Sequence, residues 1–172
     1  IGKKYIKLFQ SIEEIKNGNL ENAEKLLEEG LSYIKNETNL ITKRIDSVNT
    51  LVSFYQLLSY VYAKQKRFEE AESILNKAYI HNKNLGYSIN NPKTVQINRL
   101  LGITKYYKGD LEQSEITLKK VLISETDIIK KQTWLLPKAY KKNMFNQFNM
   151  STYNLIFNLY DKLPNGKDLA LI

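Results

Sequence analysis

Side chains that could carry catalysis are few, and their spacing does not form a catalytic group. The chain holds one histidine, His81, and no cysteine, which excludes thiol catalysis, disulfides and cysteine-bound zinc. Neighbouring acidic residues on a helix point in different directions, so they do not converge as a general acid and base. Three such pairs occur, Glu13/Glu14, Glu28/Glu29 and Glu69/Glu70. We therefore predict no enzyme activity, no metal ion and no cofactor.

Phosphate and calcium motifs are also missing from the sequence. The seven glycines never fall in the spacing of a dinucleotide-binding loop or a P-loop, so no phosphate cradle is encoded. Residues 161–166 resemble the start of a calcium loop, but Leu163 stands where an oxygen ligand is required. No helix-turn-helix, zinc finger or RNA-binding aromatic motif is present. The patterns favour binding over chemistry.

Positive charge is concentrated in the second half of the chain. The formal net charge is +8, of which residues 1–50 contribute zero, residues 51–130 contribute +4 and residues 131–172 contribute +4. The segment 130–142 carries five lysines and no acidic residue. Such a stretch suits an acidic partner or nucleic acid, or is simply a solvated helix face.

Composition is that of a folded domain without a membrane span. The 172 residues are 42% hydrophobic and 26% charged, and the mean hydropathy is −0.43. No apolar run approaches the roughly 18–20 residues that a membrane-spanning helix needs. We expect a cytoplasmic protein. Because the chain begins with Ile1 rather than Met, we also expect it to be a piece of a longer protein.

One short sequence pattern, a turn followed by an apolar and a small residue, occurs four times in the chain. In each copy a polar turn is followed by an apolar residue and, three places later, by a small residue. The copies are residues 16–23, 64–71, 107–114 and 163–170, with spacings of 48, 43 and about 56. Repeats of this length indicate a stack of small units, because one unit cannot cover its own apolar face.

Helical periodicity flanks every complete turn. Before the first turn, Ile6, Phe9, Ile12 and Ile15 recur at steps of three. Glycine and Asn or Asp favour the turns themselves, and Asn91-Pro92 suits a helix start. We predict helix pairs at 3–17 with 20–36, 41–65 with 68–84 and 92–108 with 111–130, then a helix at 137–162 with a shortened partner. The whole chain, 1–172, is expected to be one domain with repeats at 3–36, 41–84, 92–130 and 137–172, the last incomplete.

The repeated pattern resembles the motif of the tetratricopeptide repeat family. The second unit carries the strongest match, with Leu58, Ser59 and Tyr62 before the turn and then Phe68, Ala71, Leu75 and Ala78. The resemblance covers most of the chain except about 128–148. It implies an all-α, right-handed superhelical stack of antiparallel helix pairs, with a concave groove lined by the first helix of each pair. The long repeats resemble the ligand-binding half of bacterial peptide-pheromone receptors.

The resemblance also implies which side chains would face a ligand. In the family, ligands contact first-helix positions that point away from the second helix. These positions here are Gln56, Tyr60, Lys64, Gln96, Arg99, Tyr107, Asn154 and Asn158. Their amides suit a peptide backbone, and their cations suit acidic groups.

Three hypotheses follow. The first is a non-enzymatic module of a bacterial regulatory or signalling protein, which binds a peptide or a protein in the groove. The excess of lysines suits an acidic partner. The second is an assembly scaffold or chaperone adaptor. The third is a nucleic-acid binder that uses residues 130–142. The incomplete last repeat further predicts a homodimer through the C-terminal end.

Overall fold

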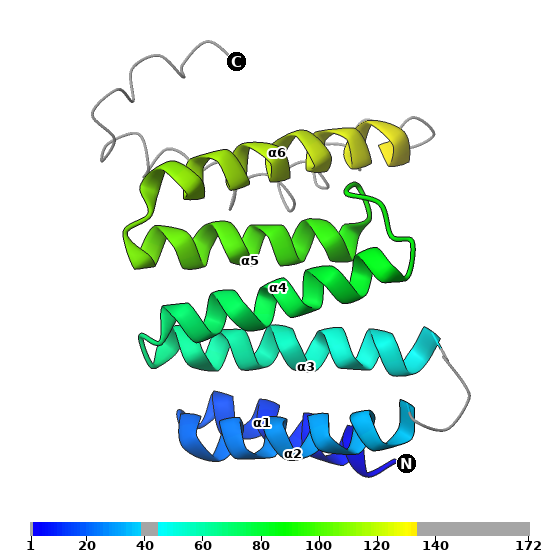
Figure 1. The fold of residues 1–172 in the computed structure, drawn as a ribbon, viewed down its shortest axis with the longest axis vertical. Coiled ribbons are helices and arrows are strands. Elements are labelled where there is room, and N and C mark those ends of the chain that lie inside the picture. Colours follow the sequence, from blue (N-terminus) through cyan, green and yellow to red (C-terminus); the bar gives the residue numbers. More distant parts are fainter. Residues whose placement is uncertain (1, 39–44, 134–172) are drawn as a thin grey trace. The chain divides into compact units, whose positions relative to one another are not determined.

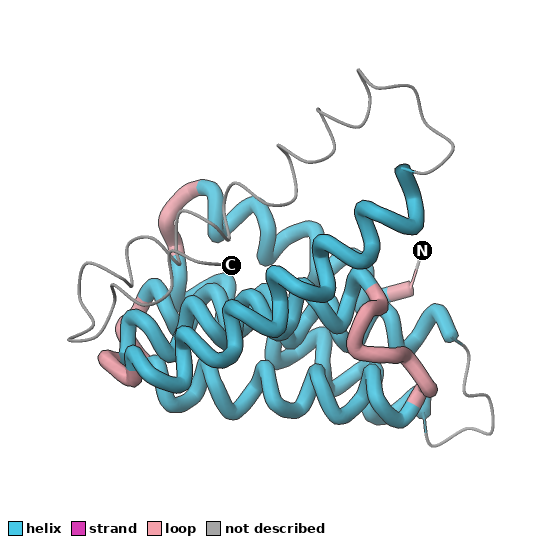
Figure 2. The backbone as a smooth tube through the Cα atoms, turned by 90° about the horizontal axis from the view of Figure 1, so that it is seen from above, coloured by secondary structure: helices cyan, strands magenta, loops and turns pink. Residues whose placement is uncertain are grey.

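The computed structural model describes residues 2–38 and 45–133, and these form six α-helices without a strand (Figure 1). Tight turns join the partners of each pair, as Figure 2 shows. None of the described helices is long and apolar enough to cross a membrane. The helices are α1 (Lys3–Lys16), α2 (Leu20–Thr38), α3 (Ile45–Lys64), α4 (Phe68–Asn84), α5 (Pro92–Lys108) and α6 (Leu111–Thr133).

The predicted all-α fold is confirmed, and the predicted helix bounds are nearly those observed. The largest difference at a described end is α6, which continues to Thr133 rather than stopping at 130. The predicted start of the third helix at 41 and the helix at 137–162 lie outside the described residues. The chain divides into two compact units, Ile1–Asn82 and Lys83–Ile172, which are described separately.

All three turns within helix pairs have the same hydrogen bonds. In each turn one residue is left-handed, with φ of 80° at Gly18, 61° at Lys66 and 93° at Gly109. The N–H of that residue donates to the carbonyl three residues back, and the next N–H donates to the carbonyl five back. This pattern satisfies helix-end carbonyls that would otherwise have no partner. Glycine was expected at two of these positions, whereas Lys66 gave no turn signal of its own.

Small and branched residues recur at fixed distances from the left-handed residue, and all of them are buried. Seven residues before it lies Ser11, Ser59 or Gly102; five after lies Ala23, Ala71 or Ser114; nine after lies Leu27, Leu75 or Leu118. Small residues let the paired helices approach closely, and the leucines then fill the space between them. The repeat seen in the sequence is therefore a repeat of packing.

Unit one is built from α1, α2, α3 and most of α4. Helix α2 packs against both α1 and α3. At the second contact a Cβ added to Gly30 would lie 2.2 Å from the ring of Phe54, which is itself fully buried. Helices α3 and α4 meet through Tyr55 and His81, whose ring centroids are 5.7 Å apart.

Unit two centres on the pair α5 and α6. A Cβ on Gly102 would lie 2.6 Å from a methyl carbon of Leu118, and the Ser114 hydroxyl donates to the Gly102 carbonyl at 2.7 Å. Val95, Val121 and Ile128 form its apolar cluster. The predicted start of α5 is confirmed, because the Asn91 side chain accepts from the Lys93 N–H.

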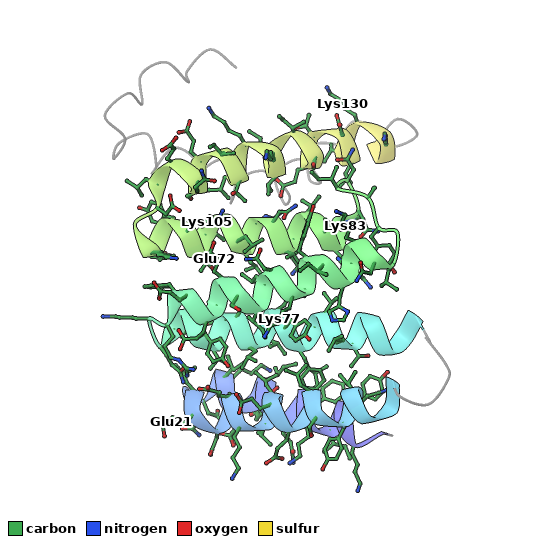
Figure 3. The ribbon with its side chains drawn as sticks, viewed as in Figure 1. Glu21, Glu72, Lys77, Lys83, Lys105 and Lys130 are labelled. Atoms are coloured by element: carbon green, nitrogen blue, oxygen red, sulfur yellow. The ribbon has the colours of Figure 1, made fainter. Side chains whose placement is uncertain are left out.

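Charged side chains favour the helix ends that suit their sign. Glu21 lies in the first turn of α2 and Lys130 in the last turn of α6, both labelled in Figure 3. Acidic groups stabilise the positive start of a helix, and basic groups stabilise its negative end.

Exchanging the left-handed residues tests this turn. Replacing the exposed Lys66 by glycine should raise the free energy of unfolding by about 1 kcal/mol, because glycine adopts positive φ without the Cβ clash. Gly109→Lys should lower it by a similar amount. Urea denaturation of both variants measures the two effects. A Lys66→Gly variant no more stable than wild type would show that the backbone at Lys66 is not strained.

The histidine predicts a stability change near neutral pH. Burial lowers the pKa of His81 below its ordinary 6.5, so below about that pH the unfolded chain binds the proton more readily than the folded chain. Stability is therefore complete above the unfolded pKa and falls as pH drops through it. Thermal melts should show a lower Tm at about pH 5.5 than at about pH 7.5, and His81→Gln should remove most of that difference. Identical pH profiles would exclude this role.

Candidate functional site

A row of three side chains, half-buried at its first member and exposed at the other two, runs along α3. Gln56, Tyr60 and Lys64 are spaced by four residues, which places them on one face of the helix. Tyr60 is 42% exposed, and the Lys64 ammonium lies 5.4 Å from the centre of its ring. The Gln56 Nε2 is buried and has no hydrogen-bond partner among the described residues. The structure thus brings three predicted residues together as one aromatic, cationic and amide-bearing strip.

The equivalent row on α1 is more apolar. Counted from the left-handed residue, Leu8 corresponds to Gln56, Ile12 to Tyr60 and Lys16 to Lys64. Leu8 and Ile12 are half-buried, and Lys16 is exposed. One turn earlier, the Tyr5 hydroxyl accepts a hydrogen bond of 3.4 Å from Thr50 of α3. In unit one the first helices therefore contact each other beside their open rows.

The row on α5 is partly engaged with the second helix of its pair. Arg99 forms an ion pair with Glu125 of α6, whose side chain is fully buried. Gln96 is exposed, and Tyr107, 61% exposed, packs its ring edgewise on Tyr106. Arg99 therefore contributes to packing within unit two, which the sequence did not indicate. Contact of Gln96, Arg99 and Tyr107 with a ligand stays a prediction.

A cavity of about 180 Å³ lies in unit two between the start of α5 and the second half of α6. It brings together Gln96 and Arg99, two of the predicted residues, with the buried carboxylate of Glu125. The lining residues are Pro92, Lys93, Val95, Gln96, Arg99, Glu125 and Ile128. Sequence reasoning missed this cavity because Glu125 and Ile128 belong to a second helix, where only packing was expected.

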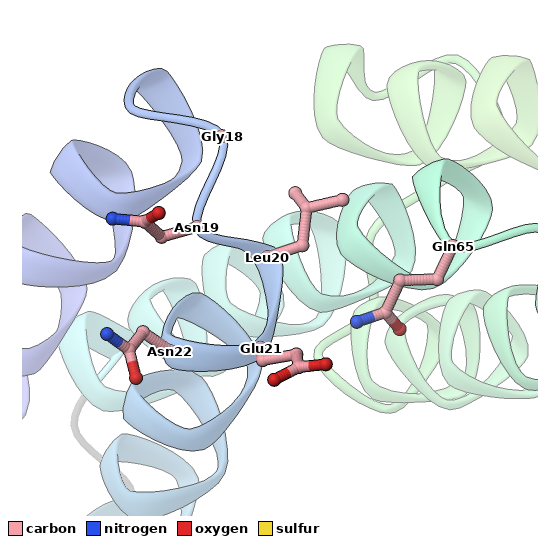
Figure 4. A pocket seen from close by; sticks show the side chains of 6 residues that line it. All are labelled: Gly18, Asn19, Leu20, Glu21, Asn22 and Gln65. Atoms are coloured by element: carbon pink, nitrogen blue, oxygen red, sulfur yellow. The ribbon is translucent and has the colours of Figure 1, made fainter.

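A larger and more polar hollow of about 540 Å³ lies at the α1–α2 turn of unit one. Residues 18–22 and Gln65 line it. Figure 4 shows Glu21 and Gln65 extending toward each other across it, whereas Asn19 and Asn22 turn to the opposite side. Its lining residues are those of the turns, so it is separate from the α3 row.

Arg67 ties this region together. Its Nη1 lies 2.8 Å and 2.9 Å from the two carboxylate oxygens of Glu24, its Nε lies 3.0 Å from Glu70, and its guanidinium stacks on Tyr62. Gln65 donates to the same Glu24 carboxylate at 3.1 Å. The guanidinium lowers the pKa of Glu70, and the two carboxylates raise the pKa of Arg67. The cluster fastens α2 to the α3–α4 turn, and we assign it a structural role.

The remaining predicted residues fall outside this picture. Asn154, Asn158 and most of the basic segment 130–142 lie beyond the described residues, as does the C-terminal end proposed for dimerisation. Within residues 2–38 and 45–133, no group of three or more His, Asp or Glu side chains is placed to hold a metal ion.

Comparisons with known proteins agree with this arrangement. Residues 52–79, which span most of α3 and α4, match the family model described as tetratricopeptide repeat. A comparison with curated protein sequences finds no match.

A solved structure, that of BtubC (BKLC) from P. vanneervenii, is similar with a TM-score of 0.62 at 18% sequence identity. The alignment covers 90% of this chain and 53% of that one, so the chain spans about half the length of that protein. At this identity the likeness concerns the fold. The chain therefore carries a tetratricopeptide repeat at residues 52–79, and its fold is similar to that of a longer helical protein.

Proposed function

We propose that the chain is the non-catalytic, peptide- or protein-binding part of a bacterial regulatory protein, and that it binds through the open face of its first helices. Tetratricopeptide repeats are in general protein-interaction modules, and the matched repeat includes α3 from residue 52 onward. The observation that carries the proposal is the α3 row. The buried Nε2 of Gln56 has no partner among the described residues, and Tyr60 is 42% exposed.

The chemistry of the α3 row suits a peptide in an extended conformation. An unpaired buried N–H costs free energy that a carbonyl oxygen from a partner would recover, and a peptide backbone supplies one at every residue. Tyr60 offers a broad apolar surface with a polar tip, which is typical of interface anchors. The row therefore combines an amide that can bond to a peptide backbone, Gln56, with an aromatic residue that can contact a peptide side chain, Tyr60.

Charge favours an acidic partner. Lys64 and Lys16 occupy equivalent places at the ends of α3 and α1, and the net charge of the whole chain is +8. A carboxylate beside Lys64 would gain a charge-assisted hydrogen bond at the rim of the row. The proposal includes the cytoplasmic location expected from the sequence.

Selection from a phage-displayed library of random dodecapeptides tests the proposal. Peptides that bind the immobilised chain should share an aromatic or aliphatic residue and an acidic residue. Tyr60→Ala should weaken their binding at least tenfold, the usual loss when an interface anchor is truncated. Fluorescence anisotropy with synthetic copies of the peptides measures the affinities.

Ile80→Ala is the matched control for this experiment. Ile80 is an exposed apolar side chain, at 55%, on the second helix α4, and its loss should leave peptide binding unchanged. Equal affinities for Tyr60→Ala, Ile80→Ala and wild type would reject the α3 row as the binding surface. Capture of folded proteins without any peptide would favour the scaffold hypothesis.

A further inference from the structure

The cavity of unit two has the size of a side-chain pocket rather than of a ligand site. Its volume of about 180 Å³ is below the roughly 300–1,000 Å³ that cofactors and drug-sized molecules occupy. It lies beside α5, and two of the predicted ligand-contact residues, Gln96 and Arg99, line it. Counted from the left-handed Gly109, Arg99 is the equivalent of Gln56 on α3. A peptide that binds along α5 would reach this cavity with one residue.

The walls of the cavity favour an aliphatic guest. Val95 and Ile128 are 4% and 7% exposed, and with Pro92 they form the apolar part of the lining. An aliphatic side chain that enters exchanges water contact for contact with these residues, which is the main source of affinity in small pockets.

The polar part of the lining has one donor, the Nε–H of Arg99, that a hydrogen-bond acceptor of the guest can satisfy. The Nη2 of Arg99 pairs with the Glu125 carboxylate, whereas the Nε of Arg99 is buried without a partner among the described residues. A carbonyl oxygen of the guest residue would satisfy that N–H. The arginine would then be bonded on two sides, with Glu125 fixing its position from the α6 side.

The charges around the cavity favour a neutral guest. Lys93 and Arg99 repel a cationic side chain, and the fully buried carboxylate of Glu125 repels an anionic one placed beside it. Both charged kinds of guest would also lose water that the apolar walls do not replace.

We propose that this cavity binds one neutral aliphatic residue of the partner peptide, such as leucine, with the side chain against Val95 and Ile128 and the backbone carbonyl accepting from Arg99 Nε. The inference rests on the proposed function, because the guest residue belongs to the peptide proposed there as the partner. It adds that unit two selects one residue type of the peptide. The α3 row, in contrast, binds the peptide backbone and an aromatic or acidic residue of the peptide.

Titration of the full 172-residue chain with N-acetyl-leucine N-methylamide, followed by amide NMR shifts, tests the cavity directly. This probe carries one side chain and the carbonyl of the same residue, and a ligand of its size binds in the millimolar range. Shifts are expected at residues 92–99 and 125–128. The matching lysine and aspartate compounds should bind at least tenfold more weakly. Absence of leucine-dependent shifts there, or equal binding of the three probes, would overturn the proposal.

Three variants complete the test. Gln96→Trp places a large ring at the exposed rim and should abolish the shifts, whereas Gln113→Trp, at an exposed position of α6 outside the lining, should leave them intact. Arg99→Lys keeps the charge but removes the Nε–H, and binding should fall at least threefold. If Gln96→Trp binds as tightly as wild type, the cavity is not the site. The phage-selected peptides test the α3 row through Tyr60→Ala, whereas the NMR shifts test the cavity. If the leucine probe does not bind, the proposal for the α3 row is unaffected. If Tyr60→Ala does not weaken peptide binding, the NMR shifts still report on the cavity.

Discussion

Close approach of neighbouring helices is the constraint on which the rest of this structure depends. Gly30 leaves room for the ring of Phe54, and Gly102 leaves room for Leu118; a single methyl group at either glycine would overlap its neighbour. Helices that meet at this depth bury their apolar stripes in each other. The left-handed turns then fix the register, so one count from the turn determines which residues are buried and which are open.

This count separates buried positions from open positions on the same helix. Ser59 is 2% exposed, and the next residue, Tyr60, is 42% exposed. A change at the first position disturbs the approach of α4, whereas a change at the second alters only what the surface offers to a partner. Arg99 is the exception, since it lies in an open row and also neutralises the buried Glu125. Packing therefore constrains substitutions in the open row of α3 less than it constrains Arg99 on α5.

The sequence predicts the helices and all three turns within helix pairs, because helical periodicity and turn residues are local properties. Helical periodicity and the glycines at 18 and 109 act over a few residues, and the observed ends follow them closely. Lys66 has no such signal, and only its place in the repeat shows that it must be left-handed. The pairs Arg67–Glu24 and Arg99–Glu125 join residues 43 and 26 positions apart. Nothing local specifies them, so the cavity beside Arg99 could not be predicted.

The hydrogen bonds that close each turn all lie within about ten residues, inside one helix pair. The connection between α4 and α5 has a left-handed residue of its own, Gly86 with φ of 76°, whose N–H donates to the carbonyl of Lys83 three residues back. The left-handed residues are 48 positions apart in the first interval, Gly18 to Lys66, and 43 in the second, Lys66 to Gly109. The difference of five lies in the helices, because α2 and α3 have 19 and 20 residues whereas α4 and α5 have 17 each. The geometry of the closing turn is therefore kept while helix length varies from one interval to the next.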